Sequence, residues 1–507
     1  MTRHVVAAAL TIALVSTAAQ RTVPAQSPSA PPAPSAEHDS LRALQQNIAA
    51  ILASPAAEQA SIGIEVRSLQ RGDRLVSVNE QKLLMPASAE KIVTLAVAAE
   101  RLGWDYEFKT DAFAIGAIAN GTLTGNLLVV GGGDPTLDNW DGIADRAFAQ
   151  FAQQLREHGI STIHGDIVGD GSLFDKRQSL GSGWAWDDLA SSYATAVSGL
   201  QFNQNTAQLA ITPGAQAGAP VRIDLLPSYA PVEFRNRATT AATRGVPLTL
   251  RAGERSPVVD VSGALLRRAP REVHNVSVTN APLYFARALR ASLTQNGITI
   301  TGSAVDANDL PAPLDRANAL PLGPIFTTRL DDMARTMMKR SQNLYAESLL
   351  RTVAVTSGTT TTNPAAVIGT ALNGWGIPSS HFLIVDGSGL SRYDLITPAA
   401  VVDVLTHVYQ EESLREPFME TLPVAGVDGT LQRRFVGTAA AGNVHAKTGT
   451  FSNARGIAGY VWTKESEPLV FTIFTNNYNT TPAAIDAVTD RIVVLLAEFS
   501  RGVTRTP

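Results

Sequence analysis

The sequence contains no cysteine and few lysines. Without cysteine, the folded chain has no disulfide bond, no thiol nucleophile and no cysteine ligand for a metal ion. Arginine supplies most of the positive charge, so a lysine that lies in a motif is more informative here than in an average protein. The lysines are Lys82, Lys91, Lys109, Lys176, Lys339, Lys447 and Lys464.

The sequence also lacks a large excess of either positive or negative charge, since the formal net charge is only −4. This balance gives no electrostatic reason to expect nucleic acid as a partner. No two histidines have the H-x-x-x-H spacing of a zinc site, and no serine lies in a G-x-S-x-G motif. We therefore expect no metal ion and no cofactor, and we disfavour a histidine-based catalytic triad.

The N-terminus has the features of a secretory signal. Arg3 and His4 precede an apolar run over residues 5–15, and small residues at 17–19 offer a cleavage site. The alternatives are a retained membrane anchor or a buried first helix, although the run is short for a bilayer span. No later segment approaches transmembrane length without charges, so we expect an exported, periplasmic or otherwise extracytoplasmic protein with no integral membrane span in the mature chain.

At 507 residues the chain is too long for one hydrophobic core. We interpret residues 1–19 as a signal peptide and residues 20–38, rich in Pro, Ala and Ser, as a tether. Short β-prone runs alternate with glycine-rich turns over 105–270, which indicates one or two inserted β-rich domains. The host domain then consists of residues 39–104 and 271–507.

The host segments carry the periodicities of helices and of antiparallel strands. Helices are predicted over 41–52, 84–102, 281–295, 330–355 and 482–499. Strands are predicted over 61–66, 75–78, 443–451, 455–463 and 468–476. Helices that flank an antiparallel sheet built from both ends of the chain predict an α+β fold.

The first candidate catalytic motif is Ser88-Ala89-Glu90-Lys91, at the start of a predicted helix. Residues three apart share a helical face, so the Ser88 hydroxyl and the Lys91 amine can approach each other. A serine hydroxyl needs a base to become a good nucleophile, and a lysine with a lowered pKa can be that base. Taken alone, the motif also fits an ordinary surface pair.

The second motif is Ser341-Gln342-Asn343, at a polar break in the predicted helix 330–355. A hydroxyl and a carboxamide at this place can relay a proton to a leaving group and orient a substrate amide. The alternative is a serine that simply caps the N-terminus of a new helix.

The third motif is Lys447-Thr448-Gly449-Thr450, on the first of three C-terminal strands. An edge strand can pair with an extended peptide, while Lys447 attracts a carboxylate and Gly449 lets a backbone come close. The alternative is a solvated strand end. His445 shares the strand face of Lys447, and we interpret it as a neighbour and not as a base.

The order of the three motifs is more specific than any one of them. Penicillin-binding proteins and serine β-lactamases use this set in this order. About 250 residues separate Ser88 from Ser341, and about 105 separate Ser341 from Lys447. Because class A β-lactamases lack such an insertion, the chain instead resembles the class C low-molecular-mass penicillin-binding proteins, the D-alanyl-D-alanine carboxypeptidase/endopeptidase family.

This resemblance covers nearly everything after the tether. It is carried by residues 85–88, 131–137, 165–170, 341–347, 386–392, 422–431 and 447–450. The resemblance implies a penicillin-binding transpeptidase-like (serine β-lactamase-like) host domain, with a five-stranded antiparallel sheet, a helical cluster and the active site between them. Two further domains would be inserted between the first and second motifs.

The resemblance also implies roles for the motif residues. Ser88 is the expected nucleophile and Lys91 the general base. Ser341 is the expected proton relay, and Asn343 the ligand of the peptide carbonyl. Gln342 stands where relatives often carry Asp, at a position that points away from the nucleophile in the family.

A carboxylate site formed by Lys447, Thr448 and Thr450 around Gly449 is implied in the same way. The backbone N–H groups of Ser88 and Thr450 would form the oxyanion hole.

Three further residues resemble the lining of a pocket for the substrate side chain. These are Arg392, Asp188 and Tyr193, for which ordinary surface or packing roles are the alternative.

The implied activity is metal-free hydrolysis of D-alanyl bonds in the stem peptides and cross-links of peptidoglycan, with β-lactams as covalent inhibitors. A β-lactamase or esterase on the same scaffold is the alternative, distinguished by rapid deacylation of the drug. A non-catalytic wall-binding module is a third possibility, and the intact Ser88 and Lys91 argue against it.

Overall fold

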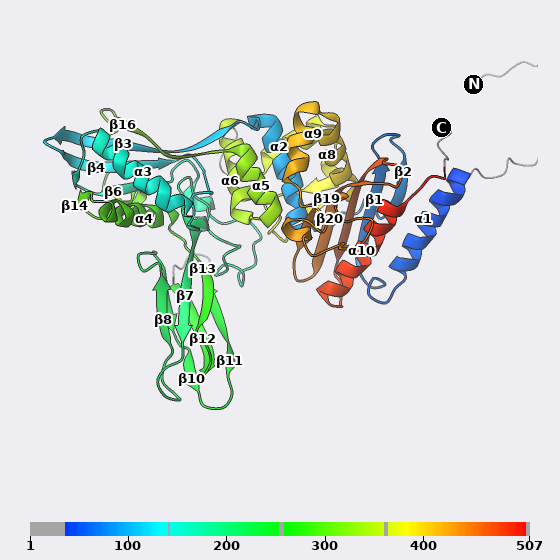
Figure 1. The fold of residues 1–507 in the computed structure, drawn as a ribbon, viewed down its shortest axis with the longest axis horizontal. Coiled ribbons are helices and arrows are strands. Elements are labelled where there is room, and N and C mark those ends of the chain that lie inside the picture. The colour runs from blue at the N-terminus through cyan, green and yellow to red at the C-terminus, as the bar shows by residue number, and fades with distance from the viewer. Residues whose placement is uncertain (1–35, 140–141, 253–257, 359–362, 503–507) are drawn as a thin grey trace, which may run out of the picture.

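A computed structural model describes residues 36–139, 142–252, 258–358 and 363–502 (Figure 1). The predicted signal peptide and most of the predicted tether lie outside these residues. Helix α1 (Ala36–Leu52) begins within the predicted tether, and acidic Glu37 and Asp39 in its first turn suit the positive end of the helix dipole. Within the described ranges, no helix is both long and apolar enough to cross a membrane.

The host domain is built on an antiparallel sheet that both ends of the chain complete. Among the described residues its five strands follow the order β19-β20-β21-β1-β2. Their bounds are Ser61–Ser68 (β1), Arg74–Val78 (β2), Val444–Thr450 (β19), Ala454–Trp462 (β20) and Pro468–Asn476 (β21). The third sequence motif therefore lies on an edge strand, as predicted.

Strand β21 shows why this sheet is covered on both faces. Successive side chains of a strand point to opposite faces. Leu469, Phe471 and Ile473 join the apolar cluster under α1 and α10 (Pro482–Glu498). Val470 and Phe474 join the cluster formed with the remaining host helices. Both sets are buried, so neither face of the strand is exposed to solvent.

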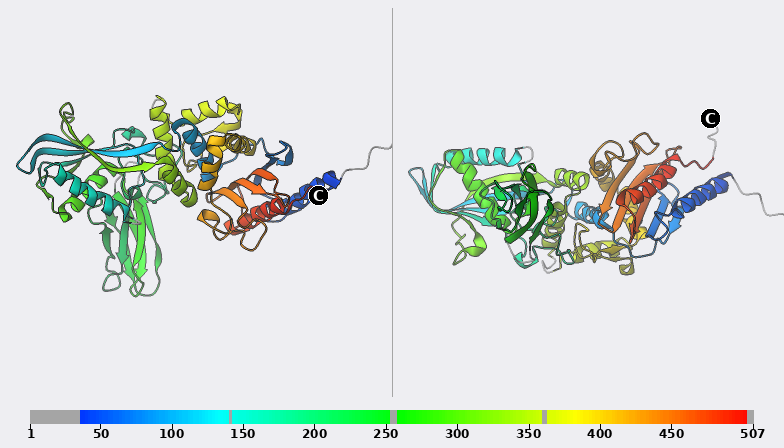
Figure 2. Two further views of the ribbon diagram at one scale, coloured as in Figure 1. Left: turned by 45° about the horizontal axis from the view of Figure 1, so that its top comes forward. Right: turned by 90° about the horizontal axis from the view of Figure 1, so that it is seen from below.

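The helical cluster lies on the face of the sheet away from α1 and α10 (Figure 2). It contains α2 (Lys91–Leu102), α5 (Leu330–Arg340), α6 (Asn343–Thr356), α7 (Ala366–Gly374), α8 (Pro398–Gln410) and α9 (Glu412–Thr421). A short strand pair, β17 (Phe382–Leu383) and β18 (Leu395–Ile396), precedes α8. The predicted break in residues 330–355 is the junction of α5 and α6.

The predicted helix over residues 84–102 begins later than expected. A 3₁₀ turn, η1 (Ala87–Glu90), precedes α2, and Leu84 instead forms a β-bridge with Ile396. Ala87 has a φ of 48°, which an α-helix does not accommodate. Ser88 therefore lies in the turn before the helix and not inside it.

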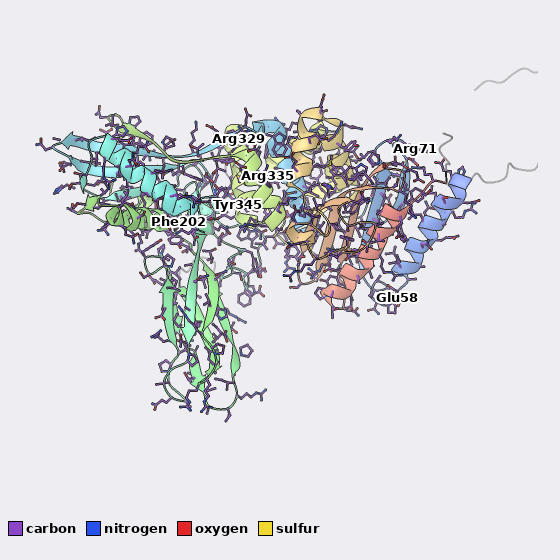
Figure 3. All side chains as sticks on the ribbon, in the orientation of Figure 1. Glu58, Arg71, Phe202, Arg329, Arg335 and Tyr345 are labelled. Atoms are coloured by element: carbon purple, nitrogen blue, oxygen red, sulfur yellow. The ribbon has the colours of Figure 1, made fainter. Side chains whose placement is uncertain are left out.

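The first part of the insertion is a sheet with two helices on it. In the described part of the chain it has seven strands: β3 (Glu107–Ala119), β4 (Thr122–Gly131), β5 (Thr162–His164), β6 (Ile167–Asp170), β14 (Thr299–Ile300), β15 (Ala304–Asp306) and β16 (Leu320–Arg329). Its helices are α3 (Ile143–Glu157) and α4 (Ala281–Gln295). Phe202 packs in this core, with its ring centroid 5.8 Å from that of Phe148 (Figure 3).

The second part of the insertion is a β module that projects from the molecule (Figure 1). One sheet holds β7 (Thr206–Thr212), β8 (Arg222–Leu226) and β13 (Glu272–Ser277). The other holds β9 (Glu233–Asn236), β10 (Thr239–Ala241), β11 (Val246–Ala252) and β12 (Val258–Leu266).

Strand pairing carries the inserted sheet beyond residue 270. Strand β16 pairs with β3 from Leu320↔Ala114 to Arg329↔Glu107, so residues up to Arg329 belong to the inserted sheet. We propose a boundary near Arg329, and the division into domains itself stays a prediction.

Candidate active site

The first serine–lysine pair lies where the sheet meets the helical cluster. Turn η1 packs against β19 and β20, which holds Ser88 beside the edge of the sheet. The fully buried Lys91 donates from Nζ to Ser88 Oγ at 2.9 Å, to Asn343 Oδ1 at 2.7 Å and to the Ser388 carbonyl at 2.7 Å. The first and second motifs therefore share one lysine.

The partners of Lys91 determine where its lone pair points. The Ser388 carbonyl can only accept a hydrogen bond, and so can Asn343 Oδ1, whose amide orientation is fixed because Nδ2 donates to the Tyr193 carbonyl at 2.8 Å. A neutral amine has two N–H groups and one lone pair. When these two acceptors take both N–H groups, the lone pair faces the Ser88 hydroxyl.

The pKa of Lys91 is lowered to about 7, chiefly because burial removes water from the ammonium form. Four carboxyl groups act in the opposite direction: Asp386, Glu347, Glu90 and Asp394. The balance leaves a substantial neutral fraction of Lys91 near neutral pH.

A second serine–lysine pair faces the first. Buried Lys447 donates from Nζ to Ser341 Oγ at 2.8 Å and to the Thr448 carbonyl at 2.7 Å. Burial lowers the pKa of Lys447, and the charge of nearby Lys91 lowers it further.

The backbone at Ser341 corrects the interpretation of that serine as a helix N-cap. Ser341 is instead the C-cap residue that follows α5, in the left-handed conformation with a φ of 59°, and Gln342 precedes α6 without a side-chain cap bond. This conformation is uncommon outside glycine. It lets the Ser341 hydroxyl accept from Lys447.

Gly449 is required by a contact within the protein. A Cβ at this position would lie 2.3 Å from the Pro86 carbonyl oxygen, so only glycine lets β19 pass this close to the turn that carries Ser88. The neighbouring Thr448 hydroxyl donates to Thr430 Oγ1 at 2.8 Å. Thr450, at the end of β19, is exposed.

The three predicted pocket residues also lie beside the motifs. The Tyr193 hydroxyl donates to Asp188 Oδ1 at 2.6 Å, and its own carbonyl accepts from Asn343. Arg392 donates to Asn453 Oδ1 at 2.8 Å and stacks over the Phe451 ring at 4.3 Å. All the predicted site residues are therefore brought to one region.

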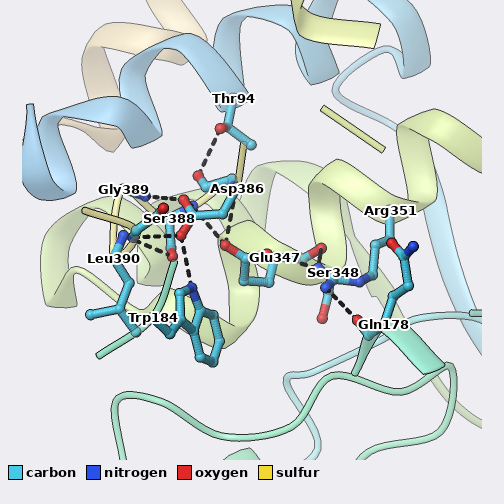
Figure 4. Close-up of polar contacts among 12 residues, drawn as sticks. Thr94, Gln178, Trp184, Glu347, Ser348, Arg351, Asp386, Ser388, Gly389 and Leu390 are labelled. Carbon is cyan, nitrogen blue, oxygen red and sulfur yellow. Dashed lines mark hydrogen bonds and ion pairs between the residues drawn. The ribbon is translucent and has the colours of Figure 1, made fainter. Parts of the chain in front are cut away.

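Three contributors were not predicted. The Ser388 carbonyl bonds Lys91, and Asp386 holds the turn that contains Ser388 (Figure 4). Trp184, from the inserted part, donates to Asp386 Oδ2 at 2.9 Å. The Asp-Gly-Ser-Gly run at 386–389 signals a carboxylate-capped turn, but its partners are hundreds of residues away in sequence.

An antiparallel sheet beside a helical cluster, with these two serine–lysine pairs at the junction, is the arrangement of serine acyl-transfer enzymes of the penicillin-binding type. The family is shown by the sequence itself. The chain belongs to the D-Ala-D-Ala carboxypeptidase 3 (S13) family, whose model matches residues 44–499.

Individual relatives agree with this family. The chain is 33% identical over 473 residues to the D-alanyl-D-alanine carboxypeptidase of Actinomadura sp. (strain R39), covering 91% of this chain and 85% of that protein. It is 28% identical over 436 residues to the D-alanyl-D-alanine carboxypeptidase DacB of Haemophilus influenzae, covering 83% and 87%.

The crystal structure of penicillin binding protein 4 (dacB) from Haemophilus influenzae matches this fold with a TM-score of 0.78 and 26% identity, covering 89% of this chain and 100% of that one. The predicted α+β penicillin-binding fold, the predicted family and its serine-type carboxypeptidase class are confirmed.

Proposed function

We propose that this chain is an exported serine D-Ala-D-Ala carboxypeptidase that acts on peptidoglycan stem peptides and also cuts D-alanyl cross-links. The observation that carries this proposal is the position of Lys91 Nζ. Two obligate acceptors take its N–H groups, so its lone pair is directed at Ser88 Oγ.

Acylation follows from this geometry. Ser88 Oγ attacks the carbonyl of the penultimate D-alanine while Lys91 Nζ takes the hydroxyl proton. The backbone N–H groups of Ser88 and Thr450 stabilise the oxyanion. Ser341, hydrogen-bonded to Lys447, passes a proton to the departing D-alanine amine, and water then hydrolyses the acyl-enzyme.

Recognition of the substrate uses both ends of this site. Lys447, Thr448 and Thr450 bind the terminal carboxylate, and Asn343 binds a peptide carbonyl. Arg392, with Asp188 and Tyr193, lines the pocket for the stem-peptide side chain. β-Lactams act as covalent inhibitors, in keeping with the name of the penicillin-binding relative of known structure.

The proposed activity is tested by changing the stereochemistry of the C-terminal residue of a peptide substrate. We expect the purified chain to release free D-alanine from a tripeptide that ends in D-Ala-D-Ala, and to leave the matched peptide ending in D-Ala-L-Ala intact. The measurement is chiral chromatography of the released amino acid. Intact D-Ala-D-Ala peptide together with catalytic destruction of benzylpenicillin would instead establish the β-lactamase alternative.

Acylation should depend on pH through Lys91. Because the proton acceptor must be neutral, and the pKa of Lys91 is about 7, the acylation rate should fall up to tenfold per unit as the pH drops below 7. The measurement is the second-order rate constant for benzylpenicillin acylation between about pH 5 and pH 8, the range in which folded domains tend to be most stable. A flat profile across pH 7 would contradict a lysine base with this pKa.

A further inference from the structure

The inserted part of the chain reaches the loop that touches Lys91. Trp184 lies in the inserted segment, and its ring packs in a small apolar cluster with Ala87, Leu390 and Phe451. Its indole N–H donates to Asp386 Oδ2 at 2.9 Å (Figure 4). The tryptophan therefore packs against the cluster that includes Ala87, the residue before Ser88, and bonds the carboxylate of the 386–391 loop.

Asp386 organises that loop through its two oxygens. Oδ1 accepts from the backbone N–H groups of Ser388 at 3.0 Å and Gly389 at 2.7 Å. Oδ2 accepts from the Ser391 N–H at 2.8 Å and from Trp184. Asp386 is buried, and hydrogen bonds from N–H donors are what stabilise a carboxylate charge at such a place.

The turn that Asp386 organises contacts the catalytic site through the Ser388 carbonyl. The Ser388 carbonyl, which these bonds orient, accepts from Lys91 Nζ at 2.7 Å. An uninterrupted series of hydrogen bonds and one short turn therefore joins the Trp184 indole to the Lys91 amine. The other bonds to the Asp386 oxygens described above come from backbone N–H groups of the loop itself, whereas the bond from Trp184 comes from a side chain of the inserted part.

We propose that Trp184 is a positioning residue through which the inserted part controls Lys91: its N–H holds Asp386, and Asp386 sets both the place of the Ser388 carbonyl and the field at Lys91. This inference rests on the proposed role of Lys91 as the base. The inserted part then influences the basicity of Lys91, in addition to lining the proposed substrate pocket with Asp188 and Tyr193.

Other charged groups face the same centre. Lys91 is surrounded by Glu90, Glu347, Asp394 and Lys447 in addition to Asp386. Glu347 accepts from the Gly387 and Ser388 N–H groups, each at 2.9 Å, and is paired with Arg351.

These contacts stay in place when Trp184 changes. The loop should therefore keep its fold without the indole, and the loss should appear in the electrostatics of Lys91.

The test is the pH profile of benzylpenicillin acylation for Trp184→Phe, which keeps an aromatic ring and removes the N–H. The N–H dipole offsets part of the Asp386 charge, so its loss strengthens the negative field and stabilises the Lys91 ammonium. We expect the acid limb to move to higher pH by about half a unit, which is roughly threefold slower acylation below pH 7.

Asp386→Asn should move the limb in the opposite direction, to lower pH, because it removes the negative charge. In an Asp386→Asn background, Trp184→Phe should not move the limb further. A mere packing defect would lower the plateau of the profile and leave the limb where it is.

Trp375, which follows α7, offers a matched control. Its indole N–H also donates to a carboxylate, that of Glu100 on α2, at 3.2 and 3.0 Å to the two oxygens. Trp375→Phe removes the same kind of bond away from the site and should leave the limb unchanged.

Several results overturn the inference. They are an unmoved limb in Trp184→Phe, an equal shift in the Trp375→Phe control, or a limb that does not fall in Asp386→Asn. The last result decides the matter even if Trp184→Phe does not fold. Failure of the wild-type chain to be acylated at all would instead refute the proposed function.

Discussion

Replacing Ser88 with alanine is expected to abolish the covalent adduct that benzylpenicillin forms with the wild-type chain. Among the described residues that hydrogen-bond Lys91 Nζ, Ser88 supplies the group that can become a nucleophile, since the other partners are the Asn343 amide oxygen and the Ser388 carbonyl oxygen. Loss of a catalytic serine lowers rates by roughly 10⁴- to 10⁶-fold. Intact-mass spectrometry after incubation with the drug should show one drug-sized increase in the wild type and none in Ser88→Ala.

Ser77→Ala is the matched control for this experiment. Ser77 is exposed on β2, at the sheet edge opposite to β19, and its exchange should leave the adduct unchanged. A drug-sized adduct that persists in Ser88→Ala would place the nucleophile elsewhere. A wild type that shows no adduct and leaves the drug intact would refute the acyl-enzyme.

The strands of the host domain were predictable because their apolar positions are strongly patterned. The three C-terminal strands match the predicted ranges to within one residue at each end, and the sheet order follows the expected closure by both chain ends. Helix α4 was predicted with its observed bounds. In each case local periodicity and burial agree, and nothing distant overrides them.

Helix α3 shows the limit of reading a long stretch by its composition. The region 105–270 is rich in glycine turns and short β-prone runs, so it was predicted to hold one or two β-rich domains, and no helix was predicted within it. Within it, Phe148, Phe151 and Leu155 have helical spacing and are buried on one face of α3. That local signal was present in the sequence and was masked by its surroundings.

The active site was predictable as a set of motifs but not as a geometry. Spacing alone places Ser88 and Lys91 together, as observed. The left-handed backbone of Ser341 and the 3₁₀ turn at Ser88 depend on contacts with β19, which is distant in sequence. The link from Trp184 to Asp386 spans 202 residues, and no local pattern encodes such a pair.

Replacing Lys91 with methionine is expected to slow acylation by roughly 10²- to 10⁴-fold, the usual contribution of a general base. Methionine is unbranched, apolar and similar in length, so it suits a fully buried position, but it offers no basic lone pair to Ser88. Ser88 keeps its hydroxyl, so a slow adduct should still form over long incubation, unlike in Ser88→Ala. The acid limb near pH 7 should disappear from the residual rate. Stopped-flow or quenched mass spectrometry at several pH values measures both effects.

Lys82→Met provides the same exchange at an exposed lysine in the segment that leads to Ser88, and it should keep both the rate and the limb. If Lys91→Met slows acylation but retains the limb, the titrating group is not Lys91. The remaining candidate is then Lys447, the other buried lysine of the site, whose amine bonds Ser341. In that case the second serine–lysine pair would supply the base, and the orientation of the Lys91 lone pair would serve only to hold Ser88.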